Sequence, residues 1–492
     1  MTRQTKIVAT LGPATDKPGV MDALIAAGLD CARLNCSHGT TDDVRRRTRE
    51  VRQAAARAGR PVAVMLDLQG PKIRLAGIAP RTVAVGEELV FVASGPHGKP
   101  NDVRVELAGF DELVSERSEL IIGDGNPRFA VVRVDRGRVY ARALSAGPVL
   151  PRKGISVTHA SPTLPAITVK DLVDLDLAPE LDVDFVAQSF VRSAIDVEQL
   201  RALLAERGSR AQVIVKVERV DAMERIDEIL DACDGVMVAR GDYGVEAGVE
   251  HVPVMQKHLI ARATAAGKNV ITATQMLESM LTNPEPTRAE ASDVANAVLD
   301  GTSAVMLSAE TSVGPHPVES VRWMAKIAVA AEENLTPNVS SRFDPDEDPT
   351  AAVMRAAVEL ATHTGAAGLI VPTSTGASAR ACSKYRPAVP IVALTHDSGV
   401  AQQLALEWGV IPSTIPAPET VDELISAGID QAARVAVFEP GATVVLTAGN
   451  IGVRGTTNLI VMRDVPAGVS QRPAETNEAG ITRAAQARAL AG

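Results

Sequence analysis

The stretch QVIVKVE, residues 212–218, has the composition of a buried strand that ends in charge. Its apolar residues 213–215 are all β-branched, which is typical of strands in a sheet that is covered on both faces. Lys216 and Glu218 are two positions apart, so their side chains project from the same face at the end of the strand. Either the two charges form a local ion pair that caps the strand, or they take part in chemistry.

Runs of the same kind recur along the chain, and they alternate with amphipathic, alanine-rich segments such as VMDALIAAGL and HLIARATAAG. Eight apolar runs begin at residues 6 (KIVATLG), 31 (CARLN), 62 (VAVMLDL), 184 (DFVAQSF), 213 (VIVKVE), 235 (GVMVARG), 269 (NVITATQ) and 304 (AVMLS). This repetition of strand and helix predicts an α/β fold in which eight parallel strands close into a (β/α)8 TIM barrel.

Polar residues stand at or just after the ends of these runs. They are Arg33, Asn35, Asp67, Ser189, Lys216, Glu218, Asp242, Thr274 and Ser308. In barrels of this type the carboxyl ends of the strands form the face on which active sites lie. We therefore expect these side chains to gather in one site.

Two intervals depart from the barrel pattern, which would otherwise comprise residues 1–72 and 156–340. Residues 73–155 contain valine-rich, glycine-punctuated segments, which predict a small β-barrel domain inserted over the active-site face as a lid; a passive insertion is the alternative. After the acidic segment RFDPDEDPT, the runs GLIVPTS, PIVALT, TVVLTAG and NLIVMRDV predict a C-terminal α/β domain at 350–468. Residues 469–492 show no strand pattern and are predicted to be a flexible tail.

The composition argues against several classes of function. The 50 Lys and Arg residues are outnumbered by 60 Asp and Glu residues, and the net charge of −10 argues against nucleic acid or an anionic membrane as a main partner. The four cysteines form no CxxC pair and have no metal-ligand spacing with histidine, so we expect reduced thiols. The sequence shows neither a signal peptide nor a run of about eighteen apolar residues, which predicts a cytoplasmic protein.

Phosphate binding must use side chains and metal ions, because the sequence has neither GxxxxGK[ST] nor GxGxxG. Arg33, with its planar guanidinium, and Lys216 are the candidate anion ligands. Glu218 and Asp242 offer the hard oxygen ligands that Mg²⁺ prefers when substrate oxygens complete its shell. Cations together with a metal favour phosphoryl or enolate chemistry. His38 follows a serine and is interpreted as a structural or phosphate-contacting residue rather than a general base.

At this point the sequence resembles a known family, the pyruvate kinases. The similar segments are TKIVATLGPA, ARLNCSHG, LDLQGPKIR, VARGDYGVE and ATQMLESMLTNPEPTRAEASDVANAVLDGTSAVMLSAET, and the resemblance extends from about residue 5 to about residue 465. It implies a barrel, a lid domain and a C-terminal regulatory domain. It further implies phosphoryl transfer from phosphoenolpyruvate to ADP with Mg²⁺ or Mn²⁺, giving pyruvate and ATP in the final step of glycolysis, and assembly as a homotetramer.

The resemblance also implies roles for individual residues. Glu218 and Asp242 match the ligands of the divalent metal. Lys216 matches the lysine that neutralises the transferring phosphoryl group, and Arg33 matches the arginine that contacts this phosphate. Thr274 matches the threonine beside the enolate carbon, which relays a proton through water. The remaining groups expected around the substrate are Ser189, Gly241, Ser308 and Glu310.

Two further sets of residues surround this centre in the resemblance. Asn35, Ser37 and Asp67 match the ligands of a monovalent cation, and Asn35 is also a candidate for substrate binding. His38 and Lys153 match residues on the nucleotide side.

Lys72, in GPKIR, stands where many members of the family have glutamate. Relatives with lysine there tend to have leucine at the position of Leu68, as this sequence does. An ammonium on the chain would supply the positive charge that K⁺ provides in other members, and it would repel a bound monovalent cation. The resemblance thus predicts an enzyme that does not need K⁺. The alternative is that Lys72 is a solvated surface lysine.

The segment PTSTGASAR, residues 372–380, follows an apolar strand and is rich in hydroxyl groups and glycine. Such a segment can bind phosphate with its hydroxyl and backbone N–H groups at a helix N-terminus. The resemblance favours a phosphorylated allosteric effector there, either a sugar phosphate or a nucleotide monophosphate; the alternative is an ordinary strand-to-helix turn with an N-cap. The candidate phosphate ligands are Thr373, Ser374, Thr375, Gly376 and Ser378.

Two other functions stay open at this stage. A metal-dependent pyruvate aldolase or phosphoenolpyruvate mutase on a similar barrel would also hold an enolate on Mg²⁺, but those enzymes lack the inserted domain and the C-terminal domain. A non-catalytic sensor of sugar phosphates would be favoured by the loss of Lys216, Arg33 or Thr274, and all three are present.

Overall fold

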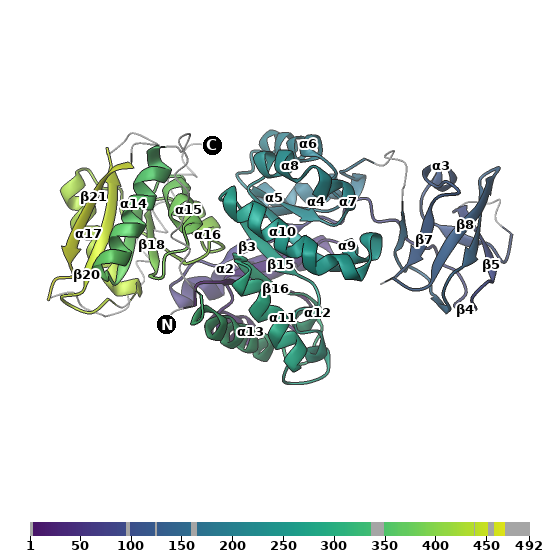
Figure 1. Cartoon of the computed structure of the whole chain (residues 1–492), viewed down its shortest axis with the longest axis horizontal. Helices are drawn as coiled ribbons and strands as arrows, with labels where there is room; N and C mark the ends of the chain where they lie inside the picture. Colours follow the sequence, from purple (N-terminus) through teal and green to yellow (C-terminus); the bar gives the residue numbers. More distant parts are fainter. Residues whose placement is uncertain are drawn as a thin grey trace.

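The computed structural model describes residues 3–94, 99–123, 125–158, 165–335, 349–436, 438–450 and 457–467. Three bodies follow one another along the longest axis of the molecule, with the barrel in the middle, the inserted β domain at one end and the C-terminal domain at the other (Figure 1). The predicted tail, 469–492, and most of the acidic segment before the C-terminal domain lie outside the described residues. None of the described helices is both long and apolar enough to span a membrane.

Eight parallel strands form the closed barrel that the sequence predicts, in the order β1-β16-β15-β14-β13-β12-β3-β2. They are β1 Lys6–Thr10, β2 Cys31–Asn35, β3 Ala63–Asp67, β12 Phe185–Gln188, β13 Gln212–Val217, β14 Gly235–Ala239, β15 Asn269–Ala273 and β16 Ala304–Leu307. Each strand coincides with one of the eight apolar runs. In β13, Ile214 packs inside the barrel, whereas Val213 and Val215 pack against the surrounding helices.

A layer of helices covers the barrel. It contains α1 Val20–Ala27, α2 Thr41–Ala58, α4 Val169–Leu175, α5 Leu177–Glu180, α6 Ala194–Glu206, α7 Val220–Glu224, α8 Ile226–Ala232, α9 Arg240–Ala247, α10 Val252–Ala265, α11 Arg288–Leu299, α12 Ala309–Ser312 and α13 Pro317–Glu332. In α2, α4 and α11 a threonine and an acidic residue form a capping box at the first turn. These caps fix the start of each helix after the loop that leaves the strand end.

The inserted domain consists of short strands around their own hydrophobic core. A six-stranded sheet has the order β11-β7-β8-β9-β5-β6, and β10 and β4 pair separately. The elements are β4 Arg81–Val83, β5 Glu88–Ala93, β6 Val103–Val105, α3 Phe110–Leu113, β7 Glu119–Ile122, β8 Arg128–Asp135, β9 Arg138–Ala143, β10 Gly147–Val149 and β11 Ile155–Val157. In the core, Phe91 and Phe129 pack edge to face with ring centroids 5.3 Å apart.

Residues 73–76 enter the inserted domain between the two edges of its six-stranded sheet. Leu75 donates its backbone N–H to the carbonyl of Lys153 at 2.8 Å and pairs with Val105 of β6 on its other side. The segment therefore closes the sheet into the small barrel that the sequence predicts. It also places residues 73–76, which enter the domain, beside residues 152–155, which leave it. We call these two paired segments the hinge ladder.

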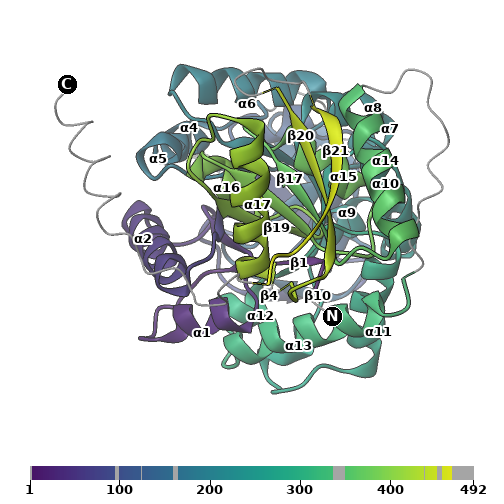
Figure 2. The ribbon, with the colours of Figure 1, turned by 90° about the vertical axis from the view of Figure 1, so that its left-hand side faces the viewer.

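The C-terminal domain has a five-stranded sheet of order β19-β18-β17-β20-β21, in which only β21 is antiparallel to its neighbour. Its elements are α14 Pro349–Thr364, β17 Gly368–Pro372, α15 Ala377–Lys384, β18 Ile391–Thr395, α16 Ser398–Leu404, β19 Val410–Thr414, α17 Val421–Ala436, β20 Thr443–Gly449 and β21 Thr457–Asp464. Figure 2 looks onto this domain and shows α17 and α14 on opposite sides of the sheet. The sequence pattern predicts four of these strands and misses β19.

The C-terminal domain covers the amino-terminal mouth of the barrel. Leu406, which follows α16, belongs to the apolar cluster inside the barrel. At the same mouth Lys6 donates to the carbonyl of Val410 at 2.6 Å, and the Asn269 amide donates to the buried carboxylate of Glu407 at 2.8 Å. The opposite end of the barrel, where the strands finish, faces the inserted domain (Figure 1).

Candidate active site

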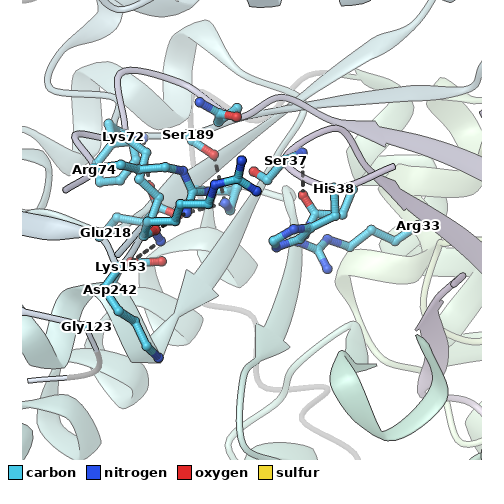
Figure 3. A pocket seen from close by; sticks show the side chains of 16 residues that line it. Arg33, Ser37, His38, Lys72, Arg74, Gly123, Lys153, Ser189, Glu218 and Asp242 are labelled. Carbon is cyan, nitrogen blue, oxygen red and sulfur yellow. Dashed lines mark hydrogen bonds and ion pairs between the residues drawn. The ribbon is translucent and has the colours of Figure 1, made fainter. Parts of the chain in front are cut away.

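A cavity with a volume of about 330 Å³ lies between the carboxyl ends of the barrel strands and the inserted domain (Figure 3). It is lined by Arg33, Asn35, Ser37, His38, Gln69, Lys72, Arg74, Gly123, Arg152, Lys153, Gly154, Ser189, Phe190, Lys216, Glu218 and Asp242. Five of these residues come from the inserted domain: Arg74, Gly123, Arg152, Lys153 and Gly154. Their position favours the interpretation of this domain as a lid over that of a passive insertion.

Positive charge dominates the lining. It contains six lysine or arginine side chains and two carboxylates, although the whole chain carries a net charge of −10. The effect is visible at His38, where partial desolvation at the rim lowers the pKa and the neighbouring cations Arg74, Lys72 and Arg33 lower it further. The lowered pKa favours a neutral imidazole, which adds no further positive charge to the cavity. A neutral ring in this position is suited to contact with an anion. The cavity is therefore suited to phosphate groups.

Lys216 of β13 lies at the centre of these charges. Its Nζ donates to Ser189 Oγ at 2.7 Å, and it lies 2.7 Å from Glu218 Oε1 and 3.5 Å from Asp67 Oδ1. Burial disfavours the charged form, but the carboxylates of Asp67 and Glu218 outweigh it and raise the pKa of Lys216 above its ordinary value. Ser189 in turn donates to the carbonyl of Leu68 at 2.8 Å, which fixes its hydroxyl as an acceptor for the lysine. Lys216 is thus held as a permanent cation.

Asp67 lies beneath the cavity and orients two of its cations. Its side chain is 1% exposed, and its Oδ2 accepts a hydrogen bond from Arg33 Nε at 2.5 Å. Arg33 Nη1 donates to Thr10 Oγ1 at 2.8 Å. Burial raises the pKa of Asp67, but Arg33 and Lys216 together bring it below its ordinary value. The structure therefore places this predicted cation ligand where it neutralises Arg33 and Lys216.

Glu218 and Asp242 are the two carboxylates of the lining. Glu218 Oε2 accepts the backbone N–H of Phe190 at 2.8 Å, and Phe190 adopts a left-handed φ of 57° to donate it. Glu218 Oε1 forms the ion pair with Lys216 but accepts no aligned hydrogen bond in the described part of the chain. Burial raises the pKa of Glu218; Lys216 opposes this rise and the charge of Asp242 adds to it.

These two carboxylates fit a divalent cation. A buried, incompletely bonded oxygen beside a second carboxylate gains favourable interactions when a cation binds between them. Within the described ranges, no cluster of three or more His, Cys, Asp or Glu side chains could hold a metal by itself. Substrate or water oxygens would therefore have to complete the shell, which is the usual arrangement for Mg²⁺ at phosphate sites.

Lys72 points into the cavity, and its Nζ lies 3.2 Å from Asp242 Oδ1 (Figure 3). Gly154 of the inserted domain lies beside it, since a Cβ added there would lie 3.3 Å from Lys72 Cε, and the Lys72 side chain is 34% exposed. Its ion pair with a second lining residue distinguishes Lys72 from a fully solvated surface lysine. Lys72 pairs with the candidate metal ligand Asp242 and not with a residue of the loop 35–37.

The loop after β2 brings three of the predicted residues to the cavity. Asn35 Oδ1 accepts the backbone N–H of Ser37 at 3.0 Å, which tightens the loop before α2 begins. His38 follows at the exposed rim. Lys153 lies at the lid side of the cavity, where its side chain passes Gly123 (Figure 3).

Besides Asp67, four residues predicted around the substrate lie outside the lining of the cavity: Thr274, Gly241, Ser308 and Glu310. The Gly241 N–H donates to Thr274 Oγ1 at 2.9 Å. Glu310 is fully buried, and its carboxylate accepts the backbone N–H groups of Ser308 at 2.7 Å and Leu277 at 3.1 Å. Glu310 therefore joins the loops after β15 and β16.

Six lining residues were not predicted: Gln69, Arg74, Gly123, Arg152, Gly154 and Phe190. Gln69 and Arg74 lie in the segment LDLQGPKIR. Because this segment resembles the family, the resemblance could have indicated both residues as part of the site. Arg152 directly precedes Lys153, and its carbonyl accepts a hydrogen bond from Arg74 Nη1 at 3.2 Å. Phe190 reaches the site through its left-handed backbone, for which the sequence gives no signal.

Comparison with known proteins agrees with this fold. The family model "Pyruvate kinase, barrel domain" matches residues 2–321, and "Pyruvate kinase, alpha/beta domain" matches residues 351–462. A protein named pyruvate kinase from Geobacillus stearothermophilus is 41% identical over 469 residues, which cover 94% of this chain and 80% of the relative. One of the same name from Mycobacterium tuberculosis is 41% identical over 466 residues, covering 94% and 98%. One from Clostridium acetobutylicum is 38% identical over 482 residues, covering 94% and 100%. The chain therefore belongs to the pyruvate kinase family of phosphotransferases.

Proposed function

We propose that this protein transfers the phosphoryl group of phosphoenolpyruvate to ADP, giving pyruvate and ATP at the end of glycolysis, with Mg²⁺ or Mn²⁺ and without a need for K⁺. The observation that carries the proposal is a cationic cavity in which Lys216 stands beside the paired carboxylates Glu218 and Asp242. Phosphoryl transfer passes through a loose transition state with charge spread over its oxygens. Its catalysis therefore depends on positive charge that is already in position.

The transfer step would use residues that the fold holds rigidly. Lys216 keeps its proton because of its carboxylate neighbours, so it can stabilise the transferring group as a cation. Arg33 engages Asp67 with Nε, which leaves other N–H groups of its fork for phosphate oxygens. Glu218 and Asp242 would hold the metal. When bound, Mg²⁺ supplies further charge neutralisation and orients the phosphate oxygens.

A second step must follow, because loss of the phosphoryl group leaves the enolate of pyruvate. One proton has to be added at its C3. We assign this relay to Thr274, acting through water, with Ser308 and Glu310 keeping the adjacent loop in place. Thr274 lies beside Gly241, directly next to the metal ligand Asp242 in the chain.

The other two functions have less support. The aldolase or mutase alternative does not account for a lid that contributes Arg152 and Lys153 to the cavity. The sensor alternative does not account for the retention of Lys216, Arg33 and Thr274.

Independence from K⁺ rests on Lys72. Its ammonium lies within the cavity and would supply a fixed positive charge near the phosphoryl group. Like charges in the same cavity repel one another. Lys72 would therefore oppose a monovalent cation bound by Asn35, Ser37 and Asp67, and would make it unnecessary.

A coupled assay with phosphoenolpyruvate, ADP and Mg²⁺ in tetramethylammonium buffer tests both parts of this proposal. We expect activity without KCl and its loss on chelation of the metal. Lys72→Glu should lose activity in this buffer and regain it with KCl, because the carboxylate restores a place for the ion. Lys17→Glu, the same charge change at an exposed position outside the lining, should behave like the wild type. An inactive wild type contradicts the function, and strong activation of the wild type by KCl contradicts the role of Lys72.

The proposed effector site lies between β17 and α15. Thr373 Oγ1 accepts the N–H of Gly376 at 2.9 Å, and Arg380 Nη2 donates to the carbonyl of Thr375 at 2.7 Å. The turn thus already satisfies part of its own backbone, as an ordinary N-cap would. The proposal is supported by the hydroxyl groups of Ser374, Thr375 and Ser378 around the N-terminus of α15 and by the nearby guanidinium. Assembly as a homotetramer stays a prediction of the family resemblance.

Calorimetry with ribose 5-phosphate, AMP, glucose 6-phosphate and fructose 1,6-bisphosphate tests the effector site. We expect saturable binding of at least one of them. Ser374→Asp should weaken that binding, because its carboxylate repels phosphate, whereas Ser398→Asp at the exposed start of α16 should not. Absence of binding by all four compounds would leave an ordinary turn.

A further inference from the structure

Arg240 is a largely buried cation that the site described above does not use. It begins α9, two residues before the candidate metal ligand Asp242, and its side chain is 11% exposed. The guanidinium extends to the end of β15, where Nε donates to the Ala273 carbonyl at 3.1 Å and Nη2 donates to the Thr274 carbonyl at 2.6 Å. Nη1 donates to Asp293 Oδ1 of α11 at 2.7 Å. Arg240 does not line the cavity.

The carbonyls that Arg240 binds belong to an unfavourable turn. Thr274 and Gln275 both have left-handed backbones, with φ of 70° and 53°. This backbone conformation is unfavourable for residues other than glycine, so the surroundings must impose it. Arg240 binds the backbone of this turn, and the N–H of the next residue, Gly241, donates to Thr274 Oγ1 at 2.9 Å. Residues 240 and 241 together hold both the backbone and the side chain of Thr274.

The hydrogen bond of the Thr274 hydroxyl gives Arg240 a second effect. Thr274 Oγ1 donates to the Ala273 carbonyl at 2.5 Å, which is the same carbonyl that Arg240 Nε binds. If the hydroxyl turns to donate to a water or to the enolate, this carbonyl keeps one partner and is not left unsatisfied. Arg240 therefore lowers the free energy needed for the hydroxyl to leave its resting bond.

We propose that Arg240 is a positioning residue for the protonation of the enolate and that it acts through Thr274. The inference rests on the proposed function, in which Thr274 relays the proton. The step adds one proton to C3 of the enolate from the hydroxyl or its bound water, and the hydroxyl regains a proton from solvent. Because Arg240 lies outside the cavity lining, its loss should impair this step more than phosphoryl transfer.

The test compares two rates in the same protein samples. The first is exchange of the pyruvate C3 protons in deuterated water with Mg²⁺ and ATP, followed by NMR, and the second is phosphoryl transfer to ADP. Arg240→Lys keeps the charge but loses the planar fork, so we expect exchange to fall about tenfold or more relative to phosphoryl transfer. Thr274→Val should show the same imbalance. In the double variant, Arg240→Lys should add little to the loss of exchange that Thr274→Val causes, because both changes remove one function.

Two further variants separate positioning from stability. Arg52→Lys is a matched control, because Arg52 also binds two backbone carbonyls and one aspartate, Asp184, but at the opposite end of the barrel. It should lower the melting temperature without changing the ratio of the two rates. Asp293→Asn leaves Arg240 in place but removes the carboxylate that orients it, and it keeps the inference testable if Arg240→Lys does not fold. It should shift the ratio in the same direction by a smaller factor.

The possible failures can be told apart. No phosphoryl transfer by the wild type would contradict the proposed function itself. Exchange that survives Thr274→Val would contradict the relay and, with it, the inference. If Thr274→Val removes exchange but Arg240→Lys lowers both rates equally, or if the double variant shows additive losses, Arg240 is structural and the inference alone is wrong.

Discussion

Replacement of Lys216 by methionine should lower kcat for phosphoryl transfer by about a hundredfold or more while the protein stays folded. Removal of one preorganised charge from such a site typically costs at least this factor. Methionine has a similar length and shape, Asp67 keeps its partner Arg33 at 2.5 Å, and Glu218, which loses its ion pair, keeps the N–H of Phe190 at 2.8 Å. The measurement is the coupled assay at saturating substrates, with circular dichroism as the check of folding.

A control for this experiment is Lys257→Met. Lys257 also pairs with an aspartate, Asp300, but its side chain is 60% exposed and outside the cavity lining. It should keep the wild-type rate. If Lys216→Met retained activity within about threefold, its barrier would have changed by less than about 1 kcal/mol. Lys216 could then not be the group that stabilises the transferring phosphoryl.

Replacement of Glu218 by glutamine should weaken metal binding and lower kcat by about a hundredfold or more at the Mg²⁺ concentration that saturates the wild type. The amide keeps an oxygen for the N–H of Phe190, which Glu218 binds at 2.8 Å, so the loop can keep its shape. What is lost is one negative charge among the two carboxylates of the lining. A catalytic metal contributes several kcal/mol of charge stabilisation, which exceeds a hundredfold in rate.

Titration with Mn²⁺, followed by its paramagnetic resonance signal, measures this binding independently of activity. Glu250→Gln removes the same charge from an exposed residue at the surface and should leave both Mn²⁺ affinity and kcat unchanged. Equal Mn²⁺ affinity in Glu218→Gln and the wild type would show that Glu218 is not a metal ligand.

The sequence predicts the barrel well because each of its strands is a short, continuous apolar run. It misses β19 for an identifiable reason. That strand, Val410–Thr414, contains Pro412 and lies at the edge of its sheet, where a missing N–H is tolerated and the apolar pattern is weak. The local composition therefore argues against a strand here, although the edge position of β19 in the folded sheet permits one.

The site is predicted in part, and the limits are physical. Lys216 and Glu218 are placed correctly together because side-chain alternation along a strand is local information. The position of Arg74 depends on the pairing of residues 73–76 with 152–155, which lie about eighty residues further along the chain, and periodicity cannot reveal such a contact. Thr274 follows its strand as predicted, but the left-handed turn that directs it is bound by Arg240, which the sequence pattern does not single out.

The hinge ladder has a consequence for the electric field of the cavity. Arg74 is on one segment of the ladder, and Arg152 and Lys153 are on the other, so hydrogen bonds join the backbones that carry these three side chains. A rotation of the lid that preserves the ladder would carry half of the six cations of the lining away from the barrel as one unit. In the open form, only the cations that are fixed to the barrel would remain beside the two carboxylates of the lining. The electrostatic attraction of the cavity for a polyanion would therefore fall as the lid opens. The movement that exposes a bound nucleotide to solvent would also lower the affinity for it.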